Sequence, residues 1–306
     1  DSMQPWLSKH EHEIDNQFKD AIIVPGLIDP HLHPPMAAVL LPMHFITAME
    51  WRLPWETVPA STTPEAFNKR LAELINNNDP TELLFTWGHH DLWHGAISRQ
   101  RINTLSSDHP IIVWNRSFHE LCMNDAALNF LDISEEETRG MEQIDYERGR
   151  FFEVGLGYAL LKLNPYILAP DRLKDGLQKL AQVVHFGGQT TVADLAVGMF
   201  DFETELASQK EVFENDDTPF RVELVANALA LRRSRSLEEM EAFIAALPEK
   251  NSHRLRFGKR VKLFSDGAFF SQLAQLMDPG YIDGHHGEWL TPPELLLENV
   301  REYWNK

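Results

Sequence analysis

The sequence has a single cysteine, Cys122, among its 306 residues. One cysteine cannot form a disulfide within the chain, and it excludes a metal cluster built from several thiolates. Positive charge is also scarce, since 28 Lys and Arg stand against 46 Asp and Glu, for a formal net charge of -18. Such a chain repels nucleic acid and anionic lipid, so we expect neither as a partner. Because the single cysteine gives no sign of an oxidising compartment, the expected location is the cytoplasm.

Long apolar runs are absent as well. The most apolar stretch, residues 34–49, is interrupted by Pro35, Pro42 and His44 and is shorter than the ~20 residues that a membrane-spanning helix needs. No such helix is expected. The chain begins at Asp1 without the pattern of a signal peptide, so we expect either a removed start or a piece of a longer protein.

Helical and strand patterns alternate in the second half of the chain. Nearly continuous apolar strands separated by amphipathic helices are typical of a parallel sheet with crossover helices, either a barrel or a doubly wound sheet. A helix with a capping box is expected to begin at Ser236, because Glu239 follows three residues later. Asp194 and Asp266 lie near the carboxyl ends of two strands, where a barrel carries its chemistry, so both are functional candidates. The expected strands are residues 190–196, 220–226 and 260–264, and the expected helices are residues 172–186, 202–215 and 236–247.

The first half has a less regular pattern. A short buried strand, interrupted by a Pro-Gly turn, is expected over residues 21–29, and a helix is expected over residues 63–77. Two further strands, 82–87 and 110–114, each run into a polar segment that contains histidine. The acidic residues 134–150 indicate a solvated loop or a boundary.

Two histidines stand at the end of the first apolar strand. His31 and His33 are separated by one residue, and alternate side chains of a strand point to the same side. Their imidazoles therefore converge, which suits two ligands of one metal ion. The other histidines lie in polar or helical contexts that favour structural or solvated roles.

Lys262 is expected inside an otherwise apolar strand, where a buried ammonium group is costly unless it is paired, neutralised or modified. One interpretation is a lysine whose amine reaches solvent or pairs with Asp266. The other is a lysine carboxylated by carbon dioxide, which provides an anionic ligand able to bridge two metal ions.

Several motifs resemble the amidohydrolase superfamily. The segment PGLIDPHLHP, residues 25–34, is similar to the signature of its first barrel strand. Residues 109–128, 187–196 and 260–276 resemble its YtcJ-like branch, which includes N-substituted formamide deformylases. The resemblance extends from residue 21 to about residue 300.

The resemblance implies an α/β fold, a metal-bearing (β/α)8 TIM barrel with a small β-sandwich. It assigns residues 1–24 to a remnant of the sandwich and residues 25–40 to barrel strand one. Residues 41–170 would be an inserted α+β subdomain with its own sheet, and residues 171–306 would hold barrel strands two to four. The later strands, with their two histidines and one aspartate, are expected beyond Lys306, so the chain is expected to be half of a barrel or to need a complementary piece.

The same resemblance implies the chemistry. His31, His33 and Lys262 would bind one or two divalent ions, most plausibly zinc, and metal-activated water would hydrolyse an amide or formamide C–N bond. His119, Glu153 and Asp266 are the expected substrate-binding residues, although Ser117 and Phe118 replace the Asp-Gly that precedes this histidine in the family. The general base, an aspartate, is expected beyond Lys306, so no catalytic residue is assigned.

Two other functions fit the same motifs. A barrel that has lost hydrolysis could serve as a small-molecule binding or regulatory protein, and a heterocycle deaminase could use the same fold. Retention of both histidines and of Lys262 favours the hydrolase. A homo-oligomer is compatible with the long insertion, by analogy with the family alone.

Overall fold

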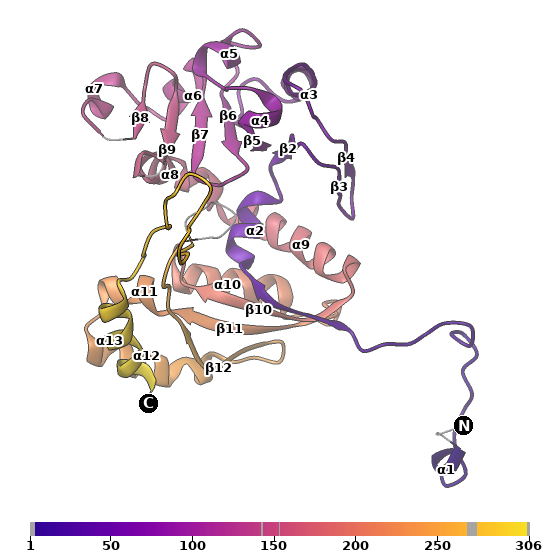
Figure 1. Cartoon of the computed structure of the whole chain (residues 1–306). Coiled ribbons are helices and arrows are strands. Elements are labelled where there is room, and N and C mark those ends of the chain that lie inside the picture. Colours follow the sequence, from indigo (N-terminus) through magenta and orange to yellow (C-terminus); the bar gives the residue numbers. More distant parts are fainter. Residues whose placement is uncertain (1–3, 142, 153, 268–273, 305–306) are drawn as a thin grey trace.

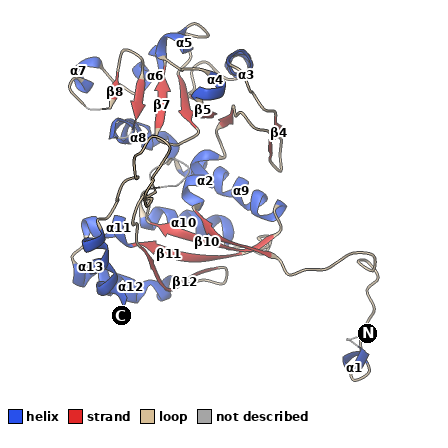
Figure 2. Cartoon of the chain, in the orientation of Figure 1, coloured by secondary structure: helices blue, strands red, loops and turns tan. Residues whose placement is uncertain are grey.

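The structure is a computed structural model that describes residues 4–141, 143–152, 154–267 and 274–304. It contains a four-stranded sheet and a six-stranded sheet, each with its own helices (Figures 1 and 2). Helix α2 (Pro34–Leu40) lies between them and carries the chain from the first sheet to the second. The expected mixed α/β fold with parallel strands is confirmed.

The four-stranded sheet contains β1 (Leu27–Leu32), β10 (Gln189–Val197), β11 (Arg221–Asn227) and β12 (Leu255–Lys262), in that order. All neighbouring pairs are parallel. In the described residues β1 and β12 are the two edges, so closure into a barrel stays a prediction. The connecting helices are α9 (Pro170–Phe186), α10 (Phe202–Phe213), α11 (Ala228–Leu231), η1 (Arg232–Ser234), α12 (Leu237–Ala246) and η2 (Leu247–Lys250).

The last strand lies further toward the N-terminus than expected. The prediction of residues 260–264 was wrong in its boundaries, because β12 starts at Leu255 and ends at Lys262. Its charged residues, such as Arg256 and Lys259, are exposed and mask the strand pattern. An edge strand tolerates charged residues, because no further strand pairs with its outer edge and their side chains can reach solvent.

Capping residues mark the first residues of two predicted helices, and the structure confirms both starts. Helix α12 begins with the predicted capping box, in which Ser236 and Glu239 each accept a hydrogen bond from the other's backbone amide. Helix α3 (Pro64–Asn77) begins after Thr63, whose Oγ1 accepts from the amide of Ala66 at 3.2 Å. Both caps satisfy amide groups that the first helical turn leaves unpaired.

The six-stranded sheet is formed within residues 44–152, inside the segment expected to have its own sheet. Strands β2, β5 and β6 are parallel, and β7, β9 and β8 continue the sheet with antiparallel pairs. The strands in spatial order are β2 (His44–Phe45), β5 (Leu84–His89), β6 (Ile111–Asn115), β7 (Glu120–Met123), β9 (Arg150–Phe152) and β8 (Ile144–Asp145). Around it lie the hairpin β3 (Trp51–Arg52) and β4 (Thr57–Val58), and the helices α3, α4 (Asp91–His94), α5 (Arg99–Asn103), α6 (Asp125–Phe130), α7 (Glu135–Thr138) and α8 (Val154–Ile167).

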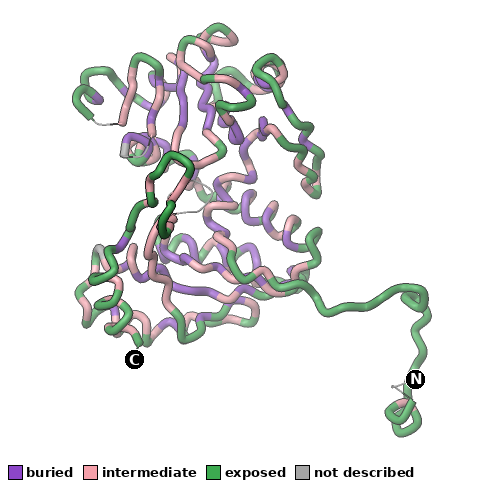
Figure 3. Tube along the Cα trace, viewed as in Figure 1, coloured by how far each residue is buried: buried purple, intermediate pink, exposed green. Residues whose placement is uncertain are grey.

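The two ends of the described chain are largely exposed. After α1 (Gln4–Leu7), residues 8–26 form no strand, so the buried strand expected from residue 21 was wrong in its start. This exposed segment projects away from the rest of the molecule before the chain enters β1 (Figure 3). Ile22, Ile23 and Val24 are all more than 60% exposed there. At the other end, α13 (Pro293–Trp304) has no buried residue. No helix in the described part of the chain is long and apolar enough to cross a membrane.

Helix α2 packs tightly on α9 because a glycine lets the backbones approach. A Cβ atom on Gly176 of α9 would lie 2.0 Å from the carbonyl oxygen of Ala38 in α2. Since α2 begins directly after His33, this contact fixes the direction in which the chain leaves β1.

Gly176→Ala should therefore lower the free energy of unfolding by about 1–3 kcal/mol, because the two helices must move apart. Gly157→Ala is the matched control: this helical glycine is exposed, a Cβ atom added to it would meet nothing within 4 Å, and the variant should gain about 0.5–1 kcal/mol from helix propensity. Urea denaturation followed by circular dichroism measures both. Equal stabilities of the two variants would contradict the close contact.

Candidate metal centre

The end of β1 brings two imidazoles together. Leu32 pairs with Asp194 of the neighbouring parallel strand β10, and Leu32 packs against the core beneath the helices. Side chains alternate along a strand, so His31 and His33 point to the opposite face. Their Nε2 atoms are 3.3 Å apart, and their rings meet edge to face with centroids 5.1 Å apart.

This spacing fits two ligands of one metal ion. A zinc ion binds imidazole nitrogen at about 2.0–2.1 Å, and a tetrahedral angle then separates two ligand nitrogens by about 3.3–3.4 Å. His33 is half-buried, and its Nδ1 atom is buried without a hydrogen-bond partner among the described residues. The donor atoms present therefore match a zinc ion in chemistry and in separation.

The electrostatic surroundings keep His33 neutral. Burial, which is the largest cause, acts together with the charges of His31 and Lys262 to lower the pKa of His33 to about 4. A neutral imidazole retains the lone pair that a metal ion needs, so His33 does not have to lose a proton at pH 7 to act as a ligand.

Lys262 lies at the carboxyl end of β12, where it is half-buried and pairs with Asn227 of β11. Only Leu255 and Phe257 of β12 are buried, and three consecutive residues before Val261 are exposed, so the expectation of a buried lysine in an apolar strand was wrong. Its Nζ atom lies 5.0 Å from the centroid of the Phe264 ring. The charge of Lys262 is the smallest of the three causes that lower the pKa of His33.

Asp266 lies four residues beyond Lys262 but is engaged elsewhere. Its carboxylate accepts hydrogen bonds from the Ser265 hydroxyl and from the amide of Gln275, the latter at 2.8 Å. These bonds lower the pKa of Asp266, and its backbone forms a bridge with Trp289. Among the interactions that the structure describes, Lys262 and Asp266 form no ion pair, so the interpretation of a paired lysine finds no support.

His119 and Glu153 are the remaining two substrate-binding candidates. His119 belongs to the six-stranded sheet, in the turn between β6 and β7, where the preceding Phe118 has a φ of 66°. It is half-buried, and its amide donates to the Ser117 hydroxyl at 3.2 Å. Glu153 lies outside the described residues.

The described residues do not complete a metal site by themselves. Within residues 4–141, 143–152, 154–267 and 274–304, no group of three or more His, Cys, Asp or Glu side chains is arranged to hold a metal ion. Two imidazoles are in place, and a protonated lysine amine is not a ligand. A third His, Cys, Asp or Glu ligand arranged with this pair is not found among the described residues.

Two other buried histidines have structural roles. The Nε2 atom of His94 lies 2.7 Å from the carbonyl oxygen of Ser61, and its Nδ1 accepts from the amide of His90. His89 places Nε2 3.0 Å from the carbonyl oxygen of Gly95, and burial lowers its pKa to about 3. Both rings are thus neutral and donate a hydrogen bond from Nε2 to a backbone carbonyl oxygen, which stabilises the loop after β5.

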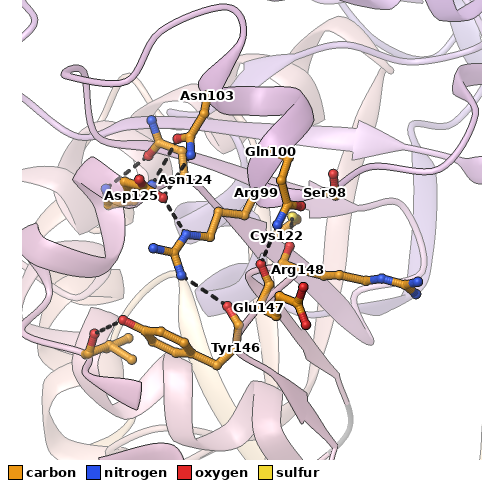
Figure 4. Close-up of polar contacts among 12 residues, drawn as sticks. Ser98, Arg99, Gln100, Asn103, Cys122, Asn124, Asp125, Tyr146, Glu147 and Arg148 are labelled. Atoms are coloured by element: carbon orange, nitrogen blue, oxygen red, sulfur yellow. Dashed lines mark hydrogen bonds and ion pairs between the residues drawn. The ribbon is translucent and has the colours of Figure 1, made fainter. Parts of the chain in front are cut away.

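A polar cluster on the six-stranded sheet is also structural (Figure 4). The guanidinium of Arg99 pairs with Asp125 and donates to the carbonyl oxygen of Tyr146, and Asn103 donates to the same aspartate at 2.8 Å. These contacts tie α5 to α6 and to the turn before β9. In the described part of the chain, none of the buried polar atoms without a partner belongs to these four residues.

Asp194 was expected to be a functional carboxylate because it lies near the carboxyl end of a strand. Asp194 is completely buried, and its side chain points toward α10, where it is hydrogen-bonded to Gln209. Its two carboxylate oxygens accept from the side-chain amide of Gln209 at 2.8 Å and from the amide of Ala196 at 3.1 Å. The alternation of Val192, Asp194 and Ala196 on one apolar face was the signal that could have shown it.

Comparisons with known proteins support the fold. No protein-family model matches the chain, and neither does any curated protein. Solved structures that share the fold include an uncharacterized metal-dependent hydrolase from Pyrococcus horikoshii OT3, with a TM-score of 0.64 and 19% identity over 92% of this chain. Another is an uncharacterized metal-dependent hydrolase from Pyrococcus furiosus, with a TM-score of 0.61 and 20% identity, also over 92%. The chain spans about half of each, 51% and 53% of their lengths.

The burial of Asp194 predicts a pH-dependent stability. Burial raises its pKa to about 7, whereas an unfolded chain has an aspartate pKa near 3.9. The folded state therefore binds the proton more tightly, and the stability that Asp194 contributes is fully present below pH ~4 and is lost as the pH rises toward 7.

Asp194→Asn should remove this loss, so that the variant gains stability relative to the natural protein between pH 4 and 7, by on the order of 1.4 kcal/mol per pKa unit. Asp216→Asn, at an exposed position, controls for the lost charge. Thermal or urea unfolding across this pH range measures the difference. Parallel curves for Asp194→Asn and the natural protein would show that Asp194 titrates normally.

Proposed function

We propose that this chain is part of a metal-dependent hydrolase that cleaves an amide-type C–N bond. The observation that carries the proposal is the 3.3 Å separation of the His31 and His33 Nε2 atoms at the end of a parallel strand. Two solved proteins that share the fold are metal-dependent hydrolases, which supports the same assignment. In parallel α/β folds the carboxyl ends of the strands are where active sites lie.

His31 and His33 would hold one divalent ion, most plausibly zinc, through their neutral Nε2 atoms. A bound ion of this kind lowers the pKa of water toward neutrality and polarises a carbonyl group. The strand fixes the backbone that carries both imidazoles before any ligand arrives, because Leu32 between them is packed against the core. Little conformational entropy is then lost when the ion binds.

Lys262 is the candidate third ligand in carboxylated form. Its ammonium group would first lose a proton to solvent. The uncharged amine would then attack the carbon of carbon dioxide, forming an N–C bond as one C=O π bond breaks, and would release a second proton to solvent. This converts a cation into an anionic carbamate with two oxygens, which suits one or two metal ions. The effect of the Lys262 charge on the pKa of His33 and the half-buried position of Lys262 support this role.

The resemblance to the YtcJ-like branch of the amidohydrolases, with its closed (β/α)8 barrel, suggests formamides and N-acyl amines as substrates. His119, Glu153 and Asp266 are the proposed substrate-binding residues on the same resemblance. The aspartate that would act as general base is proposed to lie beyond Lys306, so proton transfer cannot be assigned to a residue of this chain.

Metal binding tests the proposal directly. The full-length protein, stripped of metal and titrated with zinc, should bind about one or two equivalents per chain. A double variant, His31→Ala with His33→Ala, should weaken zinc binding by more than about 100-fold, since even supporting residues contribute 10–100-fold.

The chain provides a matched control for this double variant. His10 and His12 have the same spacing, but they lie in the exposed segment before β1. His10→Ala with His12→Ala should leave zinc binding unchanged. If both double variants bind zinc equally, or if the natural protein binds none, the hydrolase mechanism fails and a metal-free small-molecule binding protein becomes the better account.

Carboxylation of Lys262 has a spectroscopic test that does not depend on activity. Protein exchanged into 13C-bicarbonate in the presence of zinc should show a carbamate carbon signal by NMR. The signal should disappear in Lys262→Ala and remain in Lys259→Ala, which alters an exposed lysine of the same strand. A signal that persists in Lys262→Ala would place the modification elsewhere, and its absence in the natural protein would favour a site without carbamate.

A further inference from the structure

A cavity lies on the face of the four-stranded sheet opposite to the face that carries His31 and His33. It has a volume of about 210 Å3 and lies among α2, α9, α10 and the loop that precedes α10. Ala38, Leu173 and Leu177 form buried apolar walls. Thr204 and Ser208 of α10 are at its rim, where they are exposed and half-buried, respectively.

The cavity is separate from the candidate metal centre. The helices that form it cover the face of the sheet toward which Asp194 points, since Asp194 is hydrogen-bonded to Gln209 of α10. His31 and His33 point to the opposite face, because Leu32 between them is paired with Asp194. The sheet itself therefore lies between the two sites.

The carboxylates at the cavity are already engaged. Glu205 is buried, and its two oxygens accept from the backbone amides of Gly198, Phe200 and Asp201. Asp201 caps α10 by accepting from the amide of Thr204 at 2.9 Å. Because both oxygens of the buried Glu205 carboxylate are bonded to backbone amides and the buried walls are apolar, the site favours a neutral ligand over a charged one.

One polar group at the cavity lacks a partner. Gln209 is completely buried, and its side-chain amide nitrogen donates to Asp194. This bond directs the amide oxygen, Oε1, away from Asp194, and Oε1 has no hydrogen-bond partner among the described residues. A buried acceptor without a donor costs about 1–3 kcal/mol, so a ligand that supplies one hydrogen would recover part of that cost.

We propose that this cavity binds a small, neutral, largely apolar molecule with a single hydrogen-bond donor, which the Gln209 side chain recognises through Oε1. A cavity of about 150 Å3 can hold benzene in another protein, so 210 Å3 accommodates a phenol-sized molecule. The site is independent of the hydrolase proposed above.

Phenol and toluene are the matched probes, because they have nearly the same shape and only phenol can donate. Isothermal titration calorimetry of the full-length protein should show one phenol per chain, bound about five- to tenfold more tightly than toluene, the value of one hydrogen bond. Gln209→Met should bind the two equally. Equal binding by the natural protein would refute recognition by Gln209.

Ser208→Trp should fill the mouth of the cavity and weaken phenol binding at least tenfold. Ala207→Trp is its control, because Ala207 is the exposed neighbour and does not line the cavity. Leu168→Trp blocks the cavity from the opposite wall and covers the case in which Ser208→Trp unfolds. The variant without His31 and His33 should bind phenol normally. No saturable binding to the natural protein, or binding that both tryptophan blocks leave intact, would overturn the proposal.

Discussion

The candidate site depends on one constraint, the pairing of Leu32 with Asp194 between two parallel strands. This register puts Leu32 on the face that the helices bury, and it leaves His31 and His33 on the open face with their Nε2 atoms 3.3 Å apart. A shift by one residue would exchange the faces, bury the imidazoles and expose the leucine. The geometry of the metal ligands is therefore stabilised by core packing on the other side of the sheet.

The same register organises the surroundings. Asp194 is held by Gln209 and by the amide of Ala196, which fixes β10 against α10. Directly after His33 the chain enters α2, whose approach to α9 is possible because position 176 is glycine. The two histidines thus lie at the junction between the four-stranded sheet and the segment that leads to the six-stranded sheet. The face of the β1–β10 pair that carries Leu32 packs against the helices, and the face that carries His31 and His33 is the one proposed to bind metal.

Features encoded locally could be predicted from the sequence. The spacing of His31 and His33 predicted their convergence, and the caps at Thr63 and Ser236 predicted two helix starts, because each depends on residues close in the chain. The boundaries of β12 could not be predicted, since exposed charges such as Arg256 and Lys259 conceal the pattern of an edge strand. The orientation of Asp194 depends on Gln209, which is 15 residues away, and position at a strand end was not enough to determine it.

The position of a bound ion tests the central claim most directly. Crystals of the full-length protein grown with zinc, measured at the zinc absorption edge, would locate the ion by its anomalous scattering. The account predicts a peak within about 2.0–2.1 Å of the Nε2 atoms of both His31 and His33. A zinc peak that contacts neither atom, in a protein that hydrolyses its substrate, would contradict it.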